Sequence, residues 1–188
     1  MRNRSGVQHT RLSERVIDFD RLEAETEQLL RGADVYCALG TTIKKAGSQE
    51  AFRKVDYEYP AALGRAAQRD GAARLLIVSS IGANPQSKYF YLRVKADTER
   101  ALQELKLPEL AIFRPSQLLG KRKESRPAEK LAAALYKPLG KLFIGKLAKY
   151  RAIEGRIVAI AMIRAAQQGT RGVRIFESDE IAAYAIQG

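Results

Sequence analysis

The stretch Arg74-Leu75-Leu76-Ile77-Val78-Ser79-Ser80-Ile81-Gly82-Ala83 decides the fold of this 188-residue chain. After Arg74 its residues are apolar through Val78, and Ile77 and Val78 are β-branched, so the run predicts a buried strand. Small and polar residues follow at once, and they predict a turn at the strand's carboxyl end. The spacing of the next apolar residues predicts a helix with one inward face, made by Tyr91, Val94, Lys95, Thr98, Ala101, Leu102 and Leu105.

A lysine is unexpected on that inward face. Lys95 stands one helical turn after Tyr91, and a buried ammonium group is costly unless another group uses it. A cation beside a phenol favours the ionised form of the phenol, so the spacing points to proton donation by Tyr91. The alternative is a packed tyrosine beside a lysine whose stem covers apolar surface.

Strand patterns alternate with helix patterns along the rest of the chain. The expected helices run from Leu22 to Leu30, from Pro60 to Arg69, from Gly155 to Gln168 and from Asp179 onward, with Ser178 as a cap. The other expected strands are Val16–Phe19, Asp34–Leu39, Leu110–Phe113 and Val173–Phe176. This alternation predicts an α/β fold in one domain, residues 1–188, with a doubly wound parallel sheet and ligands at its carboxyl edge.

Composition narrows the class of protein. The chain is 46% hydrophobic, but it has no run of about eighteen apolar residues and its first residues are polar. Neither a membrane-spanning helix nor a secretory signal is indicated, so a cytoplasmic protein is expected. The single cysteine, Cys37, is interpreted as a small core residue rather than a redox group. No metal-ligand pattern is expected.

The net charge of +12 is concentrated in residues 121–151, which hold ten Lys or Arg against two Glu. A basic surface could bind nucleic acid, but no helix-turn-helix, zinc-finger or ribonucleoprotein motif supports that partner. Apolar and basic residues interleave here, which could cap a substrate pocket, make a peripheral membrane contact or pack on a partner. Pro138, Gly140 and Gly145 interrupt any long helix, so a substrate cap is favoured.

Several phrases resemble one protein family. Ser80 with Tyr91-Leu92-Arg93-Val94-Lys95 is similar to the serine and Tyr-x-x-x-Lys set of the short-chain dehydrogenase/reductase superfamily. The surrounding phrases resemble its atypical, TIP30-like NAD(P)-binding branch. They are residues 37–42, residues 89–95, Phe113-Arg114-Pro115 and Glu124-Ser125-Arg126-Pro127.

The resemblance implies catalytic roles for three side chains. Tyr91 would exchange a proton with a carbonyl or hydroxyl oxygen of a small-molecule substrate, while NADP, or NAD, exchanges hydride at the adjacent carbon. Ser80 would orient that oxygen, and Ser79 is the less favoured serine. Lys95 would favour the phenolate of Tyr91 and bind ribose hydroxyls.

The resemblance also implies cofactor contacts in order along the chain. They come from Arg2 and Arg4 at the 2′-phosphate, Asp18 and Phe19 at the adenine, Leu39, Gly40, Thr41 and Thr42 at the ribose and phosphates, and Arg114 and Pro115 beside the nicotinamide. Each has a simpler reading. Asp18 could end a strand before a helix cap, residues 40–42 could form a plain polar turn, and Arg114 could make a structural ion pair.

One expected phrase is missing. No Gly-x-Gly-x-x-Gly sequence occurs, so the first strand, glycine-rich loop, first helix and second strand of the family are absent and the fold is expected to be N-terminally incomplete. Our hypothesis is a start assigned about 30 residues too late, the size of the missing unit.

Three functions remain as predictions. The leading one is an NAD(P)-dependent oxidoreductase, and the main alternative is an NADP(H)-sensing regulatory or protein-binding module without turnover. A basic binder of nucleic acid or membranes is the third. The small residues of the expected helix from Pro60 to Arg69 could also pack on a second copy, as a homodimer.

Overall fold

A four-stranded parallel sheet forms the centre of the molecule. The fold is taken from a computed structural model, which describes residues 5–119, 145–169 and 171–186. The strand order is β1-β2-β3-β6. The strands are β1 (Asp34–Cys37), β2 (Arg74–Val78), β3 (Glu109–Arg114) and β6 (Gly172–Glu177), and a small second sheet pairs β4 (Leu118–Leu119) with β5 (Ile153–Glu154).

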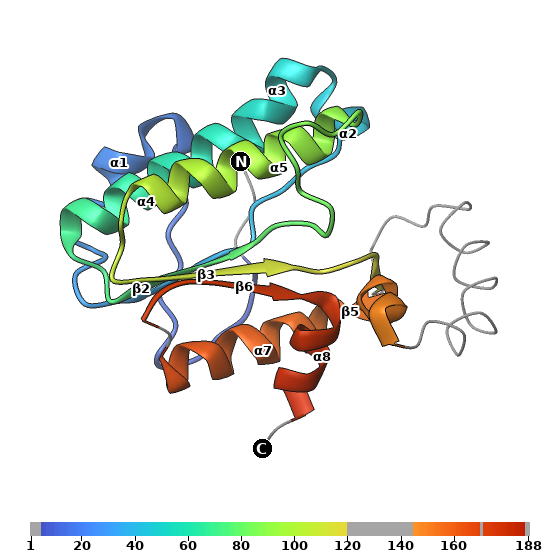
Figure 1. The fold of residues 1–188 in the computed structure, drawn as a ribbon. Helices are drawn as coiled ribbons and strands as arrows, with labels where there is room; N and C mark the ends of the chain where they lie inside the picture. The colour runs from blue at the N-terminus through green and yellow to red at the C-terminus, as the bar shows by residue number, and fades with distance from the viewer. Residues whose placement is uncertain (1–4, 120–144, 170, 187–188) are drawn as a thin grey trace.

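Helices cover both faces of the sheet, as parallel strands require. Figure 1 shows α4 (Tyr59–Asp70) and α5 (Phe90–Glu104) on one face, with α7 (Gly155–Gln168) and α8 (Ser178–Ile186) on the other. The shorter helices are η1 (Phe19–Arg21), α1 (Leu22–Glu25), α2 (Ile43–Ala46), α3 (Gln49–Arg53), the π-helical turn η2 (Lys54–Glu58) and η4 (Gly145–Tyr150).

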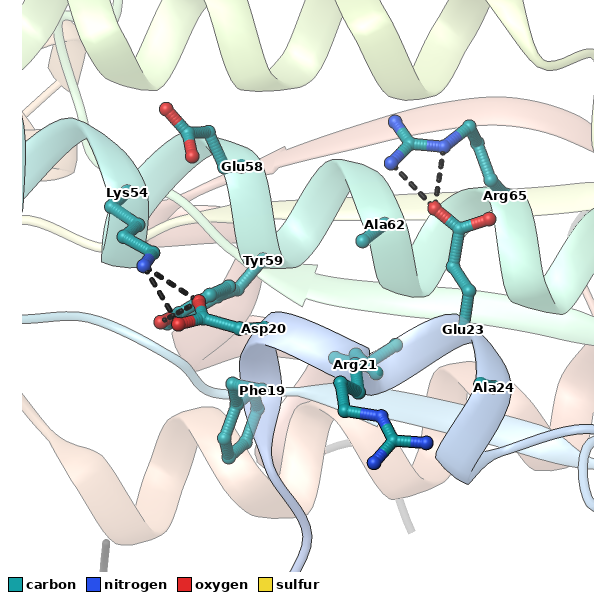
Figure 2. A pocket seen from close by; sticks show the side chains of 11 residues that line it. Phe19, Asp20, Arg21, Glu23, Ala24, Lys54, Glu58, Tyr59, Ala62 and Arg65 are labelled. Atoms are coloured by element: carbon teal, nitrogen blue, oxygen red, sulfur yellow. Dashed lines mark hydrogen bonds and ion pairs between the residues drawn. The ribbon is translucent and has the colours of Figure 1, made fainter.

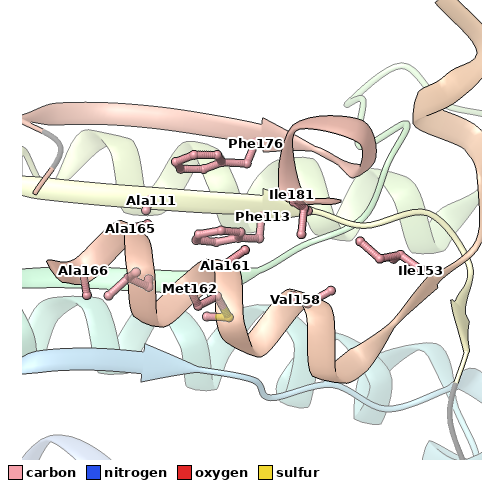
Figure 3. Packing of buried hydrophobic residues seen from close by; sticks show 11 residues of the cluster. Ala111, Phe113, Ile153, Val158, Ala161, Met162, Ala165, Ala166, Phe176 and Ile181 are labelled. Carbon is pink, nitrogen blue, oxygen red and sulfur yellow. The ribbon is translucent and has the colours of Figure 1, made fainter. Parts of the chain in front are cut away.

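Successive residues of each strand face opposite layers, which produces two cores. Leu75 pairs in register with Leu110, and both face the layer of α4 and α5, where Leu102 is fully buried. Figure 3 shows the second core, between the sheet and α7 and α8. There the rings of Phe113 and Phe176 stack with centroids 4.7 Å apart.

Two glycines shape the α4 layer. Gly64 lies where α4 meets α5, and a Cβ atom there would stand 2.4 Å from Cδ2 of Leu102. Gly64 therefore allows the two helices to approach closely. Gly71, with φ of 70°, ends α4 in the left-handed conformation that glycine adopts most easily.

The sequence predicted the sheet better than it predicted the N-terminal segment. Strands β2, β3 and β6 and helices α4, α5, α7 and α8 are confirmed, and β1 is confirmed as a shorter strand, Asp34–Cys37. The strand expected at Val16–Phe19 is wrong. A strand needs a hydrogen-bonded neighbour, and within the described residues the outer edge of β1 pairs with no other strand.

The helix expected from Leu22 to Leu30 was predicted too long, because only α1 is α-helical there and turns follow. Most of the basic segment 121–151, with its predicted substrate cap, lies outside the described residues. Among the helices that the structure describes, none is long and apolar enough to cross a bilayer.

Candidate functional site

The predicted catalytic residues gather where the sheet's carboxyl edge meets the start of α5. Ser80 follows β2 directly, and Tyr91 and Lys95 lie on the first two turns of α5. Tyr91 and Ser80 are half-buried, whereas Lys95 is only 5% exposed. The sequence therefore predicted the inward orientation of Lys95 correctly.

A buried carboxylate accounts for the buried ammonium. Nζ of Lys95 lies 2.8 Å from Oδ1 of Asp56, a residue that is 1% exposed. The two side chains therefore form a close, buried ion pair. Burial of either charge alone would be costly, so each stabilises the other in the fold.

Two further contacts hold Asp56 in place. Its Oδ2 accepts a hydrogen bond from the amide of Thr41 at 2.8 Å, and its carbonyl accepts one from Oγ1 of Thr98 at 2.8 Å. Asp56 lies in the π-helical turn η2 between α3 and α4, and such turns are frequent at functional sites. Sequence reasoning missed this residue, because Asp56 stands in a polar run with no motif around it.

Tyr91 sits between an aromatic ring and the ammonium. Its ring meets the edge of Phe52 with centroids 5.8 Å apart, and Nζ of Lys95 lies 5.9 Å from the Tyr91 ring centroid. Phe52 is fully buried, which fixes one side of the tyrosine. Ser80 donates a hydrogen bond to the carbonyl of Ile81 at 3.3 Å, a long contact that a substrate oxygen could replace.

The neighbouring serine has a different role. Oγ of Ser79 donates to Oε1 of Glu99 at 2.5 Å, and both side chains are buried. Arg114 completes the group, with its Nε 3.0 Å from Oε1 and one terminal nitrogen 2.5 Å from Oε2 of Glu99. The hydrogen bonds that Arg114 donates to the Glu99 carboxylate raise the pKa of Arg114 above its ordinary value.

These contacts favour the simpler reading of Arg114. It makes a two-pronged ion pair that ties the end of β3 to α5, which is the structural ion pair considered in the sequence. Its expected contact with the cofactor stays a prediction, and Pro115, expected beside it, is buried. The carbonyl of Pro115 accepts a hydrogen bond from the amide of Ile81 at 3.0 Å, which joins the loops after β2 and β3.

Arg93, inside the Tyr-x-x-x-Lys phrase, holds the loop between β2 and α5. Its guanidinium donates to the carbonyls of Ser87 at 2.9 Å and Lys88 at 3.0 Å. The amide of Asn84 also donates to the carbonyl of Leu92 at 3.3 Å. The loop that follows Ser80 is therefore fastened to the same helical turn that carries Tyr91.

The expected ribose and phosphate loop follows β1. Gly40 is exposed, Leu39 and Thr41 are half-buried, and Oγ1 of Thr42 accepts a hydrogen bond from the amide of Lys45 as the cap of α2. The loop therefore runs from the carboxyl end of β1 to the cap of α2, and its predicted contact with the ribose and phosphates stays a prediction. Just before it, burial raises the pKa of the Cys37 thiol, as fits a core residue.

The expected adenine contacts lie elsewhere on the surface. Oδ1 of Asp18 accepts from the amide of Asp20 and caps η1, and the Phe19 ring packs on Tyr59 with centroids 5.2 Å apart. Asp18 therefore caps a helical turn rather than ending a strand, as its simpler reading expected, and its contact with the adenine stays a prediction. Arg2 and Arg4 lie outside the described residues.

Figure 2 shows the groove of about 410 Å³ between this N-terminal segment and α4. Asp20 accepts hydrogen bonds from Nζ of Lys54 at 2.9 Å and from the Tyr59 hydroxyl at 2.8 Å. The hydrogen bond from Lys54 is the larger cause, and both bonds lower the pKa of Asp20. Arg65 pairs with Glu23 at 2.6 Å. The polar side chains pair across the groove, so we interpret it as a packing contact of the N-terminal segment.

The fold and these loops define a class of protein. A parallel sheet covered by helices on both faces, with polar loops at its carboxyl edge, is the arrangement of an atypical NAD(P)-binding Rossmann protein. The chain belongs to the HIM1 family, whose profile matches residues 15–148.

Comparison with known proteins supports the same class. Protein HTATIP2 of Rattus norvegicus is 38% identical over 129 residues, which cover 68% of this chain and 52% of that protein. Protein FMP52, mitochondrial, of Candida albicans is 43% identical over 94 residues, 50% of this chain and 41% of that protein. The chain spans about half the length of these curated relatives or less.

Similarity to a solved structure supports the fold of this chain only. MoeE5 in complex with UDP-glucose and NAD aligns with a TM-score of 0.59 at 12% identity, over 89% of this chain and 66% of that one. The predicted Rossmann-like fold is thereby confirmed, and this structural neighbour binds NAD.

The expected location needs correction. The sequence predicted a cytoplasmic protein, but fungal relatives in the family are named as mitochondrial proteins. The prediction rested on the absence of recognisable signals, and such an absence does not identify a compartment.

Proposed function

We propose that this chain carries the catalytic side of an NADP-dependent oxidoreductase that acts on a small carbonyl or hydroxyl compound, with NAD as the other candidate cofactor. The observation that carries the proposal is the pair of Tyr91 and buried Lys95 on one face of α5, at the carboxyl edge of a parallel sheet. Ligands of open α/β sheets bind at that edge.

The residues present fit one end of a dinucleotide. The hydroxyls of Thr41 and Thr42 suit ribose oxygens, and Lys95 lies one turn from Tyr91. When bound, the nicotinamide would supply or accept hydride. The sequence has no glycine-rich phosphate phrase, so we assign no residue of this chain to the pyrophosphate.

The chain's own chemistry is a proton transfer. In reduction, the Tyr91 hydroxyl would donate its proton to the substrate oxygen as that oxygen gains negative charge. Ser80 would hold the same oxygen by exchanging its long hydrogen bond to Ile81. The positive charge of Lys95 would stabilise the resulting phenolate, and Phe52 would keep the ring in place.

The test is to compare two tyrosine variants for NADPH binding and for reduction of a panel of small aldehydes and ketones. Tyr91→Phe should lower turnover by about 10²- to 10⁴-fold, the usual contribution of a general acid, while NADPH binding persists. Tyr89→Phe is the matched control, because Tyr89 is 73% exposed two residues earlier. Equal turnover in Tyr91→Phe and the unmodified protein would refute the catalytic role.

A second candidate function is an NADP(H)-sensing module that binds a protein partner without turnover. The observation in its favour is that Asp56 already satisfies Lys95 within the fold, so the lysine has a structural use. In that case the unmodified chain binds NADPH, reduces no member of the panel, and keeps its partner when Tyr91 is changed to Phe.

A further inference from the structure

We infer that Asp56 is a positioning residue that joins the predicted cofactor loop to Lys95, so that the loop after β1 and helix α5 respond to a ligand as one unit. The expected effect of Asp56 on cofactor binding rests on the proposed function. The structural part of the inference, the linkage itself, stands on contacts within the chain.

The linkage runs through the two oxygens of one carboxylate. Oδ2 accepts from the Thr41 amide at 2.8 Å, and Oδ1 lies 2.8 Å from Nζ of Lys95. Thr41 follows β1, whereas Lys95 belongs to α5 after β2, so Asp56 bridges two segments that are far apart in the sequence. A change on either oxygen alters the charge or position of the other.

The carboxylate has little freedom to move. Asp56 is 1% exposed, and its own carbonyl is held by Oγ1 of Thr98, one turn after Lys95 on α5. Gly40 closes the other side, since a Cβ atom there would lie 3.5 Å from Oδ1. The buried thiol of Cys37 is close enough to act electrostatically on this pair.

A close ion pair suits this role. Asp56 fixes the position of the ammonium, and a single contact with Oδ1 leaves the other N–H groups of Lys95 available. They can donate to ribose hydroxyls while the opposite charge still holds the lysine in place.

Hydrogen–deuterium exchange of the 188-residue chain tests the linkage without any ligand. Lys95→Met leaves the Asp56 charge unpaired in the interior, so the carboxyl group either takes up a proton or turns away. Both changes weaken its bond to the Thr41 amide. Exchange in a peptide covering residues 40–42 should rise about threefold to tenfold, the loss of one hydrogen bond, although Lys95 itself does not touch Thr41.

The control is Lys54→Met, because Lys54 makes an exposed ion pair with Asp20 in the same helical run. It should leave exchange at residues 40–42 unchanged. The double variant Asp56→Asn/Lys95→Met carries no buried charge, so it should melt above either single variant, and its exchange should equal that of Asp56→Asn alone. Wild-type exchange in Lys95→Met, or melting losses that simply add in the double variant, would overturn the inference.

NADPH titration of the same proteins separates a positioning role from a merely structural one. Asp56→Asn should weaken NADPH binding about tenfold, the loss of one charge-assisted hydrogen bond from Lys95. Gly155→Ala, which adds a methyl group at the start of α7 where nothing lies within 4 Å, should leave the affinity unchanged. If the unmodified chain binds no NADPH, the proposed function fails, while the exchange data still decide whether Asp56 links the two segments.

Discussion

The contact between α4 and α5 at Gly64 allows a quantitative test of the packing. In Gly64→Ala, the new Cβ would stand 2.4 Å from Cδ2 of Leu102 and 2.8 Å from Cδ1 of Leu105. Leu102 is fully buried, so it cannot turn into solvent to make room. Either this leucine adopts a strained rotamer or the helices separate.

Two opposing effects, overpacking and helix propensity, set the size of the change in the free energy of unfolding. Overpacking a core with one methyl group costs about 1–3 kcal/mol, whereas alanine is favoured over glycine inside a helix by about 1 kcal/mol. The short distances place the packing cost in the upper part of its range. We expect Gly64→Ala to lower the free energy of unfolding by about 1–2 kcal/mol.

Urea unfolding followed by circular dichroism measures this loss. Gly155→Ala is the control, since Gly155 begins α7 and a Cβ atom there would meet nothing within 4 Å. It should not destabilise the protein. A Gly64→Ala variant as stable as the unmodified protein, with the same dependence on urea, would show that the two helices are not in close contact at this point.

Two further predictions concern buried groups. Arg114→Met should lower the free energy of unfolding by about 3–5 kcal/mol, because Glu99 then keeps an unpaired charge in the interior. Adding Glu99→Gln removes that charge and should restore part of the lost stability, as measured by thermal melting. Cys37 should resist a disulfide reagent in the native state and react quickly in urea, since burial raises its pKa. The raised pKa also means that stability is fully present below the ordinary pKa of a thiol and falls as the pH rises through the native pKa. Cys37→Ala should remove that alkaline dependence.

Local patterns explain which parts of the fold could be predicted. The central residues of β2 and β3, Leu75–Val78 and Leu110–Phe113, are apolar because both faces of the sheet are covered, and such runs identify buried strands from sequence. The helical spacing also placed Lys95 on an inward face. At Val16–Phe19 the local pattern was misleading, since a strand depends on a neighbour that the local sequence does not specify.

The partners of the buried charges could not be predicted in the same way. Asp56 meets Lys95 only because η2 packs against α5, and Glu99 meets Arg114 only where α5 crosses the end of β3. Neither pair has the fixed spacing of a motif. The sequence therefore identified Tyr91 and Lys95 as candidates, but it left the charge that balances the lysine unassigned.

The paired register of β2 and β3 has a consequence for the loops at their ends. Leu76 lies opposite Ala111 and Val78 opposite Phe113, and alternate residues enter different cores. A slip of one residue would turn every leucine and phenylalanine of a strand toward the wrong layer. The position of each terminal loop along the strand axis can therefore change only in steps of two residues. The register of β2 and β3 thus fixes where Ser80, in the loop after β2, lies along the strand direction.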